Sequence, residues 1–397
     1  MWNLAVISLV LLSFVLGMCE FIMIGIVPNV SESLDISVTQ SGMLISWFAL
    51  AYAIGAPLLS IWGSRFERYR FLILLTLLYV IGNGAAFFVE SYGALLTDRI
   101  FLASLSGVML AVSTTFAPDI ADRKYLPSVM AWIFAGFSIA SVLGVPVGVL
   151  AAQYVSWKYI FLFIAAVGLI NAFLLMKSLP RGGKKPAPVS LRQQFSLLAD
   201  RRILLGMGIA LTALAGNYNW YAYVTPLLRD VVGLSAPAVS TFLFLFGAMT
   251  ILSNLGSGKI AALGGMYILW PILATEALVI LSLLIALHIF WLGLLLILLL
   301  GVYIYIYNSS IQIYFLHISN VFHPGTMLMA GALLPMAANL GIAAGTAVGS
   351  ITVDTAGLAW TPLPGAILMA AAAFISWYLM TPERKRLKRI SYNKNGG

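Results

Sequence analysis

Residues 290–307 read FWLGLLLILLLGVYIYIY, an 18-residue run without a charged side chain. A transmembrane helix needs about 20 predominantly apolar residues. The same character extends along the whole chain, because 61% of its 397 residues are hydrophobic and only 9% are charged. An ordinary soluble domain is about 45–50% apolar and about 25% charged. The composition therefore predicts a membrane protein and excludes a soluble one.

The spacing of the apolar runs predicts an all-α polytopic membrane protein. A membrane β-barrel is excluded, because its strands would alternate apolar and polar residues. Twelve spans of about 20 residues would use nearly all of the roughly 242 hydrophobic residues. We expect helices near 4–29, 40–62, 71–89, 95–118, 127–151, 158–177, 203–226, 237–260, 267–287, 290–316, 326–350 and 362–380.

The chain is expected to consist of two pseudo-symmetric six-helix bundles. Its longest polar stretch, 178–202, is rich in Pro, Gly and Lys and reads as a cytoplasmic linker. It separates an N-terminal bundle, 1–177, from a C-terminal bundle, 203–380, which a basic tail, 381–397, follows. Small residues recur at every fourth position in corresponding helices of the two halves. They are Gly136, Ala140, Gly144 and Gly148, and then Ala337, Gly341, Gly345 and Gly349. Such a stripe lets helices approach closely, and plain helix packing is the favoured interpretation. The functional alternative is a smooth interface between the halves that can slide or rock.

Lysine and arginine set the predicted orientation. With the N-terminus in the cytoplasm, 19 of the 22 basic residues fall on the cytoplasmic side, and Arg99, Lys158 and Arg229 are the exceptions. This asymmetry follows the positive-inside rule. We therefore expect both termini in the cytoplasm, the inner (cytoplasmic) membrane as the location, and the basic tail against anionic lipid. The start of the chain has no basic region before its apolar run, so we expect a retained first helix and not a signal peptide.

Several other kinds of chemistry are excluded. One cysteine, Cys19, and three scattered histidines offer no spacing suited to a metal site. The net charge of +9 fits basic loops of a membrane protein better than nucleic-acid binding. Gly256-Ser-Gly-Lys259 lacks the remaining features of a phosphate-binding loop. No nucleophile, base and acid are grouped, so we expect neither an enzyme nor a bound cofactor, and we expect a monomer.

Three segments carry a resemblance to a known family. The loop Gly63-Ser-Arg65-Phe-Glu67-Arg68-Tyr-Arg70 resembles the motif G-x-x-x-D-R-x-G-R-R, with Glu in place of Asp. Asp98-Arg99, with Gly107 downstream, resembles a membrane-embedded arginine motif, and Gly144-Val-Pro146-Val-Gly148 resembles the Gly-Pro motif of antiporters. The chain thus resembles the major facilitator superfamily. Within it, the stretch Glu20–Pro28 is typical of bacterial twelve-helix drug–proton antiporters, and Ala215–Tyr223 is similar to purine base and nucleoside efflux pumps. That branch contains efflux pumps for purine bases and nucleosides, for sugars and for drugs.

The resemblance implies that a proton gradient is the energy source, with protons and a small solute as partners. Glu20 lies midway along the apolar first helix, where a charge costs about 2.5–3.5 kcal/mol. It can avoid the cost by binding a proton, so we expect it to couple transport to protons, together with Asp98 and Arg99. The alternative for Glu20 is a neutral acid bonded to a neighbouring helix, and for Asp98 and Arg99 a structural ion pair. For Glu276 we favour packing against a polar group, because its helix is expected to lie outside the central cavity.

Aromatic and polar side chains on three helices are the expected substrate site, because such walls suit a planar polar solute. We take Tyr303, Tyr307 and Gln312 to share one helix face. The predicted set is Asn217, Tyr218, Trp220, Tyr221, Tyr303, Tyr307, Asn308, Gln312 and Asn339. For any single tyrosine, packing or anchoring at the membrane interface is the alternative.

Residues of the loop motif and of the Gly-Pro segment are the expected gating elements. Asp119 and Asp122 are expected close to the basic loop, where a charge cluster could latch the cytoplasmic gate, although solvated loop charges would give the same pattern. The predicted gating set is Gly63, Arg65, Glu67, Arg68, Asp119, Gly144, Pro146 and Gly148.

Taken together, the sequence predicts a proton-coupled exporter of a small organic solute that works by alternating access. Purine base or nucleoside efflux and drug efflux are the first readings, and sugar efflux is an alternative. A channel or a lipid flippase of similar architecture also stays open: a channel would show flux that neither saturates nor depends on protons, and a flippase would need a lateral opening and a headgroup site.

Overall fold

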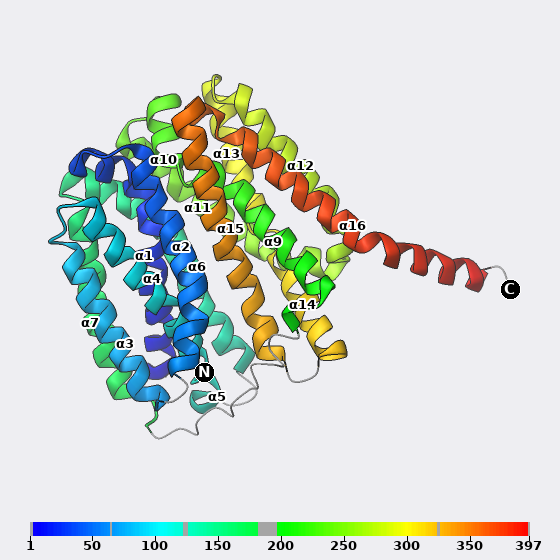
Figure 1. The fold of residues 1–397 in the computed structure, drawn as a ribbon, viewed down its shortest axis with the longest axis horizontal. Helices are drawn as coiled ribbons and strands as arrows, with labels where there is room; N and C mark the ends of the chain where they lie inside the picture. Colours follow the sequence, from blue (N-terminus) through cyan, green and yellow to red (C-terminus); the bar gives the residue numbers. More distant parts are fainter. Residues whose placement is uncertain (1–2, 64–65, 122–125, 182–196, 324–325, 396–397) are drawn as a thin grey trace. The chain divides into compact units, whose positions relative to one another are not determined.

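The computed structural model describes residues 3–63, 66–121, 126–181, 197–323 and 326–395, and within these ranges no residue lies in a β-strand. Figure 1 shows the order of the helices along the chain. Eleven candidate spans in the described part are long and apolar enough to cross a membrane. The remaining transmembrane helix, α9, carries Arg201, Arg202, Asn217 and Asn219 and is therefore less apolar. The all-α, twelve-helix fold predicted from the sequence is confirmed.

The chain divides into two compact units, Met1–Pro188 with Ala222–Ala248, and Val189–Tyr221 with Met249–Gly397. The first unit contains α1 (Leu4–Leu34), α2 (Val38–Gly63), α3 (Arg68–Ala86), α4 (Tyr92–Thr114), α5 (Ala117–Ile120), α6 (Leu126–Tyr154), α7 (Lys158–Ser178), α10 (Val224–Pro226) and the π-helical turn η1 (Leu227–Val231). The second contains α9 (Arg201–Tyr221), α12 (Met266–Ala286), α13 (Phe290–Tyr303), α14 (Asn308–Phe322), α15 (Met327–Ala356), the 3-10 turn η2 (Leu358–Trp360) and α16 (Pro362–Asn395). Helix α11 (Ala236–Leu263) runs from the first unit into the second.

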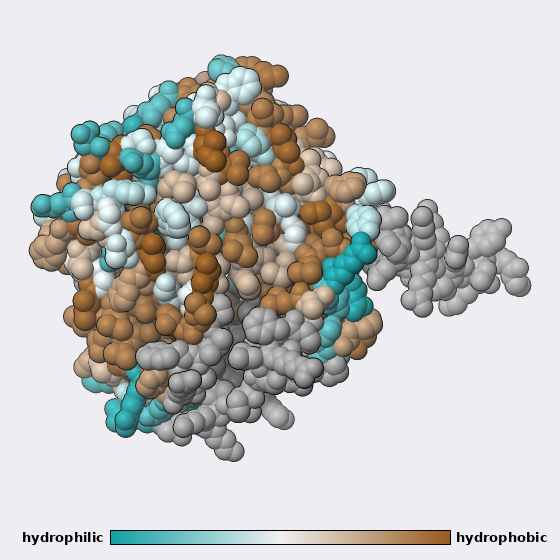
Figure 2. Space-filling view, in the orientation of Figure 1, coloured by the Kyte–Doolittle hydropathy of each residue, from teal (hydrophilic) through white to brown (hydrophobic). Residues whose placement is uncertain are grey.

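The core of each unit is formed by pairs of helices that pack along one another. In the first unit α1 packs along α6, and α2 along α4; in the second, α9 packs along both α15 and α16. Large apolar side chains on the outer faces stay exposed, among them Ile81 on α3 and Ile170 on α7. Figure 2 shows brown hydrophobic side chains gathered on the lower left flank of the face it draws, with teal hydrophilic ones at its lower end. An apolar belt of this kind suits contact with lipid tails.

Two predicted helices are broken in the structure, and a third ends before its predicted boundary. The expected helix 203–226 ends at Tyr221 as α9, and a turn at 222–223 precedes α10. Pro226 explains this break, because it has no N–H to donate to the carbonyl of Ala222 and its ring would clash there. The expected helix 290–316 is α13 and α14, separated by a turn at 304–307. The expected helix 95–118 likewise ends at Thr114 and is followed by the short α5.

The glycines of the stripe pack against a helix of their own unit. A Cβ added at Gly136 would lie 2.3 Å from the carbonyl oxygen of Val10 on α1, and one at Gly148 would lie 3.1 Å from that of Ile22. In the second unit a Cβ at Gly345 would lie 2.3 Å from the carbonyl oxygen of Ala215 on α9. The stripe therefore brings α6 onto α1, and α15 onto α9, as expected for helix pairs that pack through small residues. These contacts agree with the interpretation as helix packing, and a sliding interface between the halves remains a prediction.

The predicted domain boundaries at 177, 203 and 380 remain predictions. Most of the linker, 182–196, lies outside the described residues, and α16 continues through the predicted tail as far as Asn395.

Candidate functional site

A buried arginine on α4 organises the polar centre of the first unit. The side chain of Arg99 is 0% exposed. Its Nη2 donates to the carbonyl oxygen of Cys19 on α1 at 2.6 Å, and its Nη1 lies 3.2 Å from Cys19 Sγ. The guanidinium also stacks over two aromatic rings, at 4.4 Å from the centroid of Phe48 and 5.6 Å from that of Phe161. Arg99 thus connects α1, α2, α4 and α7 around a fixed positive charge.

Two carboxyl groups lie within electrostatic range of this arginine. They belong to Glu20, the residue after Cys19 on α1, and to Asp98 on α4. Among the described residues Arg99 forms no ion pair with either. Glu20 Oε2 and Asp98 Oδ2 are each buried without a hydrogen-bond partner. The structure therefore brings Glu20 and Asp98 near the charge of Arg99, and the role of these three residues in proton coupling stays a prediction.

The second unit contains a buried acid–amide pair. Glu276 on α12 is 0% exposed, and its Oε1 accepts a hydrogen bond of 2.8 Å from Asn217 Nδ2 on α9. Glu276 Oε2 and Asn217 Oδ1 have no partner. The expectation that Glu276 packs against a polar group of a neighbouring helix is confirmed. Asn217, predicted to bind substrate, donates to this acid in the structure.

The aromatic residues of α9 are almost completely enclosed. Tyr218, Trp220 and Tyr221 are 2%, 0% and 5% exposed. The ring of Tyr221 packs edge-on against that of Tyr218, with centroids 5.4 Å apart, and also contacts that of Trp220 at 5.9 Å. The predicted aromatic wall is thus present on α9 as one cluster, and its contact with substrate is untested.

The predicted substrate residues of α13 and α14 do not share one helix face. The turn at 304–307 separates Tyr303 from Gln312, so the helical spacing used to group them with Tyr307 does not apply. Tyr307 is 0% exposed, and its hydroxyl has no partner. Asn308 Nδ2 donates to Asn254 Oδ1 on α11 at 3.4 Å, and Gln312 Nε2 to the carbonyl oxygen of Ala330 at 3.5 Å.

The last predicted substrate residue, Asn339, lies on α15. Its Nδ2 donates to the carbonyl oxygen of Pro335 at 3.1 Å, one turn earlier, and its buried Oδ1 is unpartnered. A buried acceptor without a hydrogen bond lowers stability, so Asn339 Oδ1 suits a donor supplied by a solute or by water.

The predicted gating cluster forms at the end of α4. Arg68 pairs with Asp119 on α5, and its Nη1 donates to the carbonyl oxygen of Thr115 at 2.7 Å. Glu67 pairs with Arg70 at 3.0 Å. The expected proximity of Asp119 to the basic loop is confirmed, whereas Arg65 and Asp122 lie outside the described residues. At the end of α2, a Cβ on Gly63 would lie 2.1 Å from Phe71 Cε1, so only glycine fits there without a shift of that ring.

The Gly-Pro segment of α6 contacts both α1 and α11. Gly144 faces Phe21, whose Cβ lies 3.2 Å from a Cβ added at Gly144, and Ser240 Oγ on α11 donates to the carbonyl oxygen of Pro146 at 3.0 Å. This segment therefore connects elements of the first unit, and its part in gating remains a prediction.

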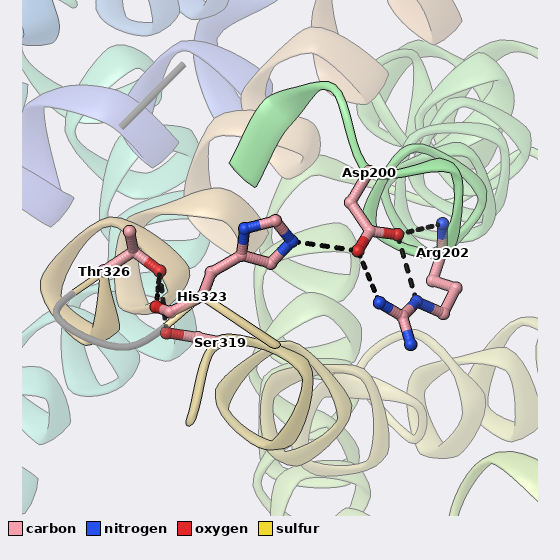
Figure 3. Close-up of polar contacts among 5 residues, drawn as sticks. All are labelled: Asp200, Arg202, Ser319, His323 and Thr326. Carbon is pink, nitrogen blue, oxygen red and sulfur yellow. Dashed lines mark hydrogen bonds and ion pairs between the residues drawn. The ribbon is translucent and has the colours of Figure 1, made fainter. Parts of the chain in front are cut away.

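A second charged group, missed from the sequence, joins the start of α9 to the end of α14. Figure 3 shows Asp200 between Arg202 and His323. Asp200 Oδ2 accepts from Arg202 Nη2 at 2.7 Å and lies 3.0 Å from His323 Nε2. The hydrogen bonds from Arg202, and then that from His323, hold the pKa of Asp200 well below its usual value. Next to His323, the Thr326 hydroxyl donates to the carbonyl oxygen of His323 at 2.8 Å.

The first unit has a tie at the corresponding place. Asn3, which caps α1, donates from Nδ2 to the carbonyl oxygen of Ile120 at 2.9 Å. The first unit therefore joins the start of α1 to the end of α5, and the second joins the start of α9 to the end of α14, but of these two ties only the one at Asp200 is between titratable groups. A sequence signal existed, since position 200 follows position 3 by 197 residues, close to the offset of 201 between Gly136 and Ala337.

The model of the Major Facilitator Superfamily matches residues 9–331. The chain belongs to this superfamily. It is 30% identical over 387 residues to the uncharacterized MFS-type transporter YtbD of Bacillus subtilis (strain 168), covering 96% of this chain and 97% of that protein. It is 26% identical over 259 residues to the inner membrane transport protein YdhP of Escherichia coli (strain K12), covering 65% of this chain and 66% of that one.

Solved structures agree with the fold. A crystal structure of a D-xylose-proton symporter superimposes with a TM-score of 0.77 at 15% identity, covering 94% of this chain and 96% of that one. A bacterial homologue of the human lysosomal transporter Spinster, in an inward-facing, unoccupied conformation, gives 0.71 at 15% identity, covering 94% of each chain. This superfamily member is therefore a multi-pass membrane transporter and not an enzyme.

Proposed function

We propose that the protein is a proton-coupled secondary transporter that exports a small organic solute by alternating access. The observation that carries the proposal is the setting of Glu20 on α1, where one carboxyl oxygen is buried without a partner within range of a buried arginine. A full charge in such a place is costly, so the acid exchanges between a neutral and an ionised form as its access to water changes. Each exchange alters the charge balance around Arg99.

The exchange provides coupling if proton and solute favour opposite steps of one conformational equilibrium. Open to the more acidic outside, Glu20 takes up a proton. Open to the cytoplasm, it releases that proton, and binding of the solute favours the release. The solute then leaves when the protein opens outward and Glu20 is protonated again.

Contacts within the first unit support a gate made by the segment Ala222–Ala248. Pro28 cannot donate to the carbonyl of Ile24, and the Thr225 hydroxyl donates to that oxygen at 2.8 Å instead. Arg229 pairs with Glu32 at 3.0 Å. In the predicted orientation these contacts lie at the outer end, so they would break and re-form as that end opens and closes.

Once the buried aromatic cluster of α9 opens toward the solute during the cycle, it favours a planar, partly polar solute over an unbranched apolar one, because flat rings stack on such walls. Purine bases, nucleosides and planar drugs are therefore our first substrate classes. Sugar is the second candidate: the unpaired Oδ1 of Asn339 and hydroxyl of Tyr307 could accept hydrogen bonds from a polyol. The symporter named above shares only the fold, and its sugar is a property of that protein.

For location we propose the inner membrane with both termini in the cytoplasm, on the strength of the asymmetry of lysine and arginine. A protease added to intact spheroplasts should leave the tail beyond Met380 uncut, and should cut it in inverted vesicles. The opposite pattern would reverse the topology.

The test of function uses purified protein in proteoliposomes. A counterflow screen of purines, nucleosides, sugars and planar cationic dyes identifies a solute, and an imposed pH gradient then drives its accumulation. For one proton per solute, each pH unit provides about 1.4 kcal/mol, or about tenfold accumulation. We expect Glu20→Gln to keep counterflow and to reduce accumulation to equality. Glu90→Gln, at an exposed loop position, is the matched control and should accumulate solute normally. Uphill transport by Glu20→Gln with unchanged pH dependence would refute the assignment.

A further inference from the structure

The second unit holds a carboxyl group that the proposed cycle does not use. Glu276 is completely buried on α12, and it forms no ion pair among the described residues. Among the described residues its hydrogen bond comes from a neutral donor, Asn217 Nδ2. A buried carboxylate without a cation or several donors is strongly disfavoured. In this conformation the acid is therefore neutral, with its proton on the unpartnered Oε2.

The position of this acid connects it to both broken helices. Asn217 lies on the last turn and a half of α9, just before the turn at 222–223. Tyr307 ends the turn between α13 and α14, and its buried, unpartnered hydroxyl is within electrostatic range of Glu276. Helix breaks inside a membrane protein are tolerated where they border an ion or solute site. Glu276 is thus bonded to the helix that ends at Tyr221 and lies within electrostatic range of the turn at 304–307.

We propose that Glu276, held by Asn217, is a second proton-binding site, in which the acid is protonated in this conformation and releases its proton when water reaches it. The proposal rests on the proposed proton-coupled function, but it concerns a different unit and a different acid from Glu20. The ionised form would accept the bond from Asn217 Nδ2 more strongly than the neutral form does. The pair would therefore tighten on proton release and loosen on proton uptake.

A vibrational experiment tests the site without a known solute. Infrared spectra of the purified full-length protein are recorded across the pH range in which it stays folded, and those of Glu276→Gln are subtracted. We expect a C=O stretch of a protonated carboxyl at acidic and neutral pH, which disappears at alkaline pH as carboxylate bands grow. A band that persists at every pH marks a permanently neutral structural acid, and no band at any pH marks an ionised one; either result overturns the proposal. Loss of the band on replacing K⁺ by Na⁺ at constant pH would also overturn it, in favour of a sodium site.

A second variant covers the case in which Glu276→Gln does not fold. Asn217→Ala keeps the acid and removes the donor to its Oε1, so the C=O band should shift in frequency and persist to higher pH. An unchanged band would show that the pair in the structure does not govern the acid, and would overturn the proposal.

The two hypotheses can fail separately. Glu20→Gln should retain the whole Glu276 signal, because the two acids lie on different helices of different units. Once counterflow has identified a solute, the proton-to-solute ratio should fall by one in Glu276→Gln, whereas Glu20→Gln should lose uphill transport. A lost infrared signal with intact coupling through Glu20 rejects only the second site; an intact signal with uncoupled transport in the wild type rejects only the proposed function.

Discussion

The contact between α1 and α6 permits a graded prediction from three glycines. A Cβ added at Gly136 would lie 2.3 Å from the carbonyl oxygen of Val10, an atom of the backbone. Ordinary contact needs about 3.5 Å, so the two helices must separate by about 1 Å, which forfeits a quarter to a half of the attraction between the atoms in contact. A Cβ at Gly144 meets Phe21 Cβ at 3.2 Å, and one at Gly84 meets nothing within 4 Å.

Because helices in a membrane associate through packing and not through the hydrophobic effect, these distances translate into stability. We expect Gly136→Ala to cost about 3 kcal/mol or more and Gly144→Ala about 1 kcal/mol. Gly84→Ala, the control on α3, should be neutral or stabilising by a few tenths of a kcal/mol. In the second unit Gly345→Ala should match Gly136→Ala, since its Cβ would also lie 2.3 Å from a backbone oxygen.

The assay is thermal unfolding of the purified protein in detergent, together with the amount inserted into the membrane. The order Gly136→Ala, Gly144→Ala, Gly84→Ala from least to most stable is required by the distances. If Gly136→Ala is as stable as Gly84→Ala, the close approach of α6 to α1 does not hold the first unit together, and the reasoning is refuted.

Three further predictions concern contacts at the ends of helices. Asp119→Asn should change the unfolding temperature little, because the ion pair with Arg68 is partly exposed and worth about 0–1 kcal/mol. If the pair latches a gate, the same variant should alter the transport rate several-fold. An unchanged transport rate would make the pair a structural contact. Thr225→Val removes the donor to the carbonyl oxygen of Ile24 and should lower the stability of the protein by about 1 kcal/mol. It should also change the accessibility of the outer end, measured by labelling of cysteines introduced nearby. Equal labelling in both proteins would contradict the gate. Because the pKa of Asp200 is lowered, this carboxylate contributes to the stability of the fold above its unfolded pKa of about 3.9, and the contribution is lost as the pH falls through the folded value. Asp200→Asn should therefore lose about 2 kcal/mol of stability at neutral pH, and the difference from the wild type should vanish in acid. A difference that does not depend on pH would reject the contacts of Asp200 with Arg202 and His323 as its source.

The sequence by itself determined the class of the molecule. Long uncharged runs can only be accommodated in lipid as helices, because a helix satisfies its own backbone hydrogen bonds, so the number of spans follows from composition and length. An acid in the middle of an apolar helix, such as Glu20, is conspicuous for the same reason. Even the break after Tyr221 had a local cause in Pro226, which the sequence displays.

Only the tertiary structure decided where the other features lie. The turn at 304–307 depends on a distant helix, because the N–H of Tyr305 donates to Ser253 Oγ on α11 at 2.9 Å in place of an acceptor in its own helix. The glycine at 345 faces α9, and Glu276 accepts a hydrogen bond from Asn217, 59 residues away in the sequence. Helical periodicity states which residues share a face, but not which neighbour that face meets; the neighbour is fixed by packing of the whole bundle.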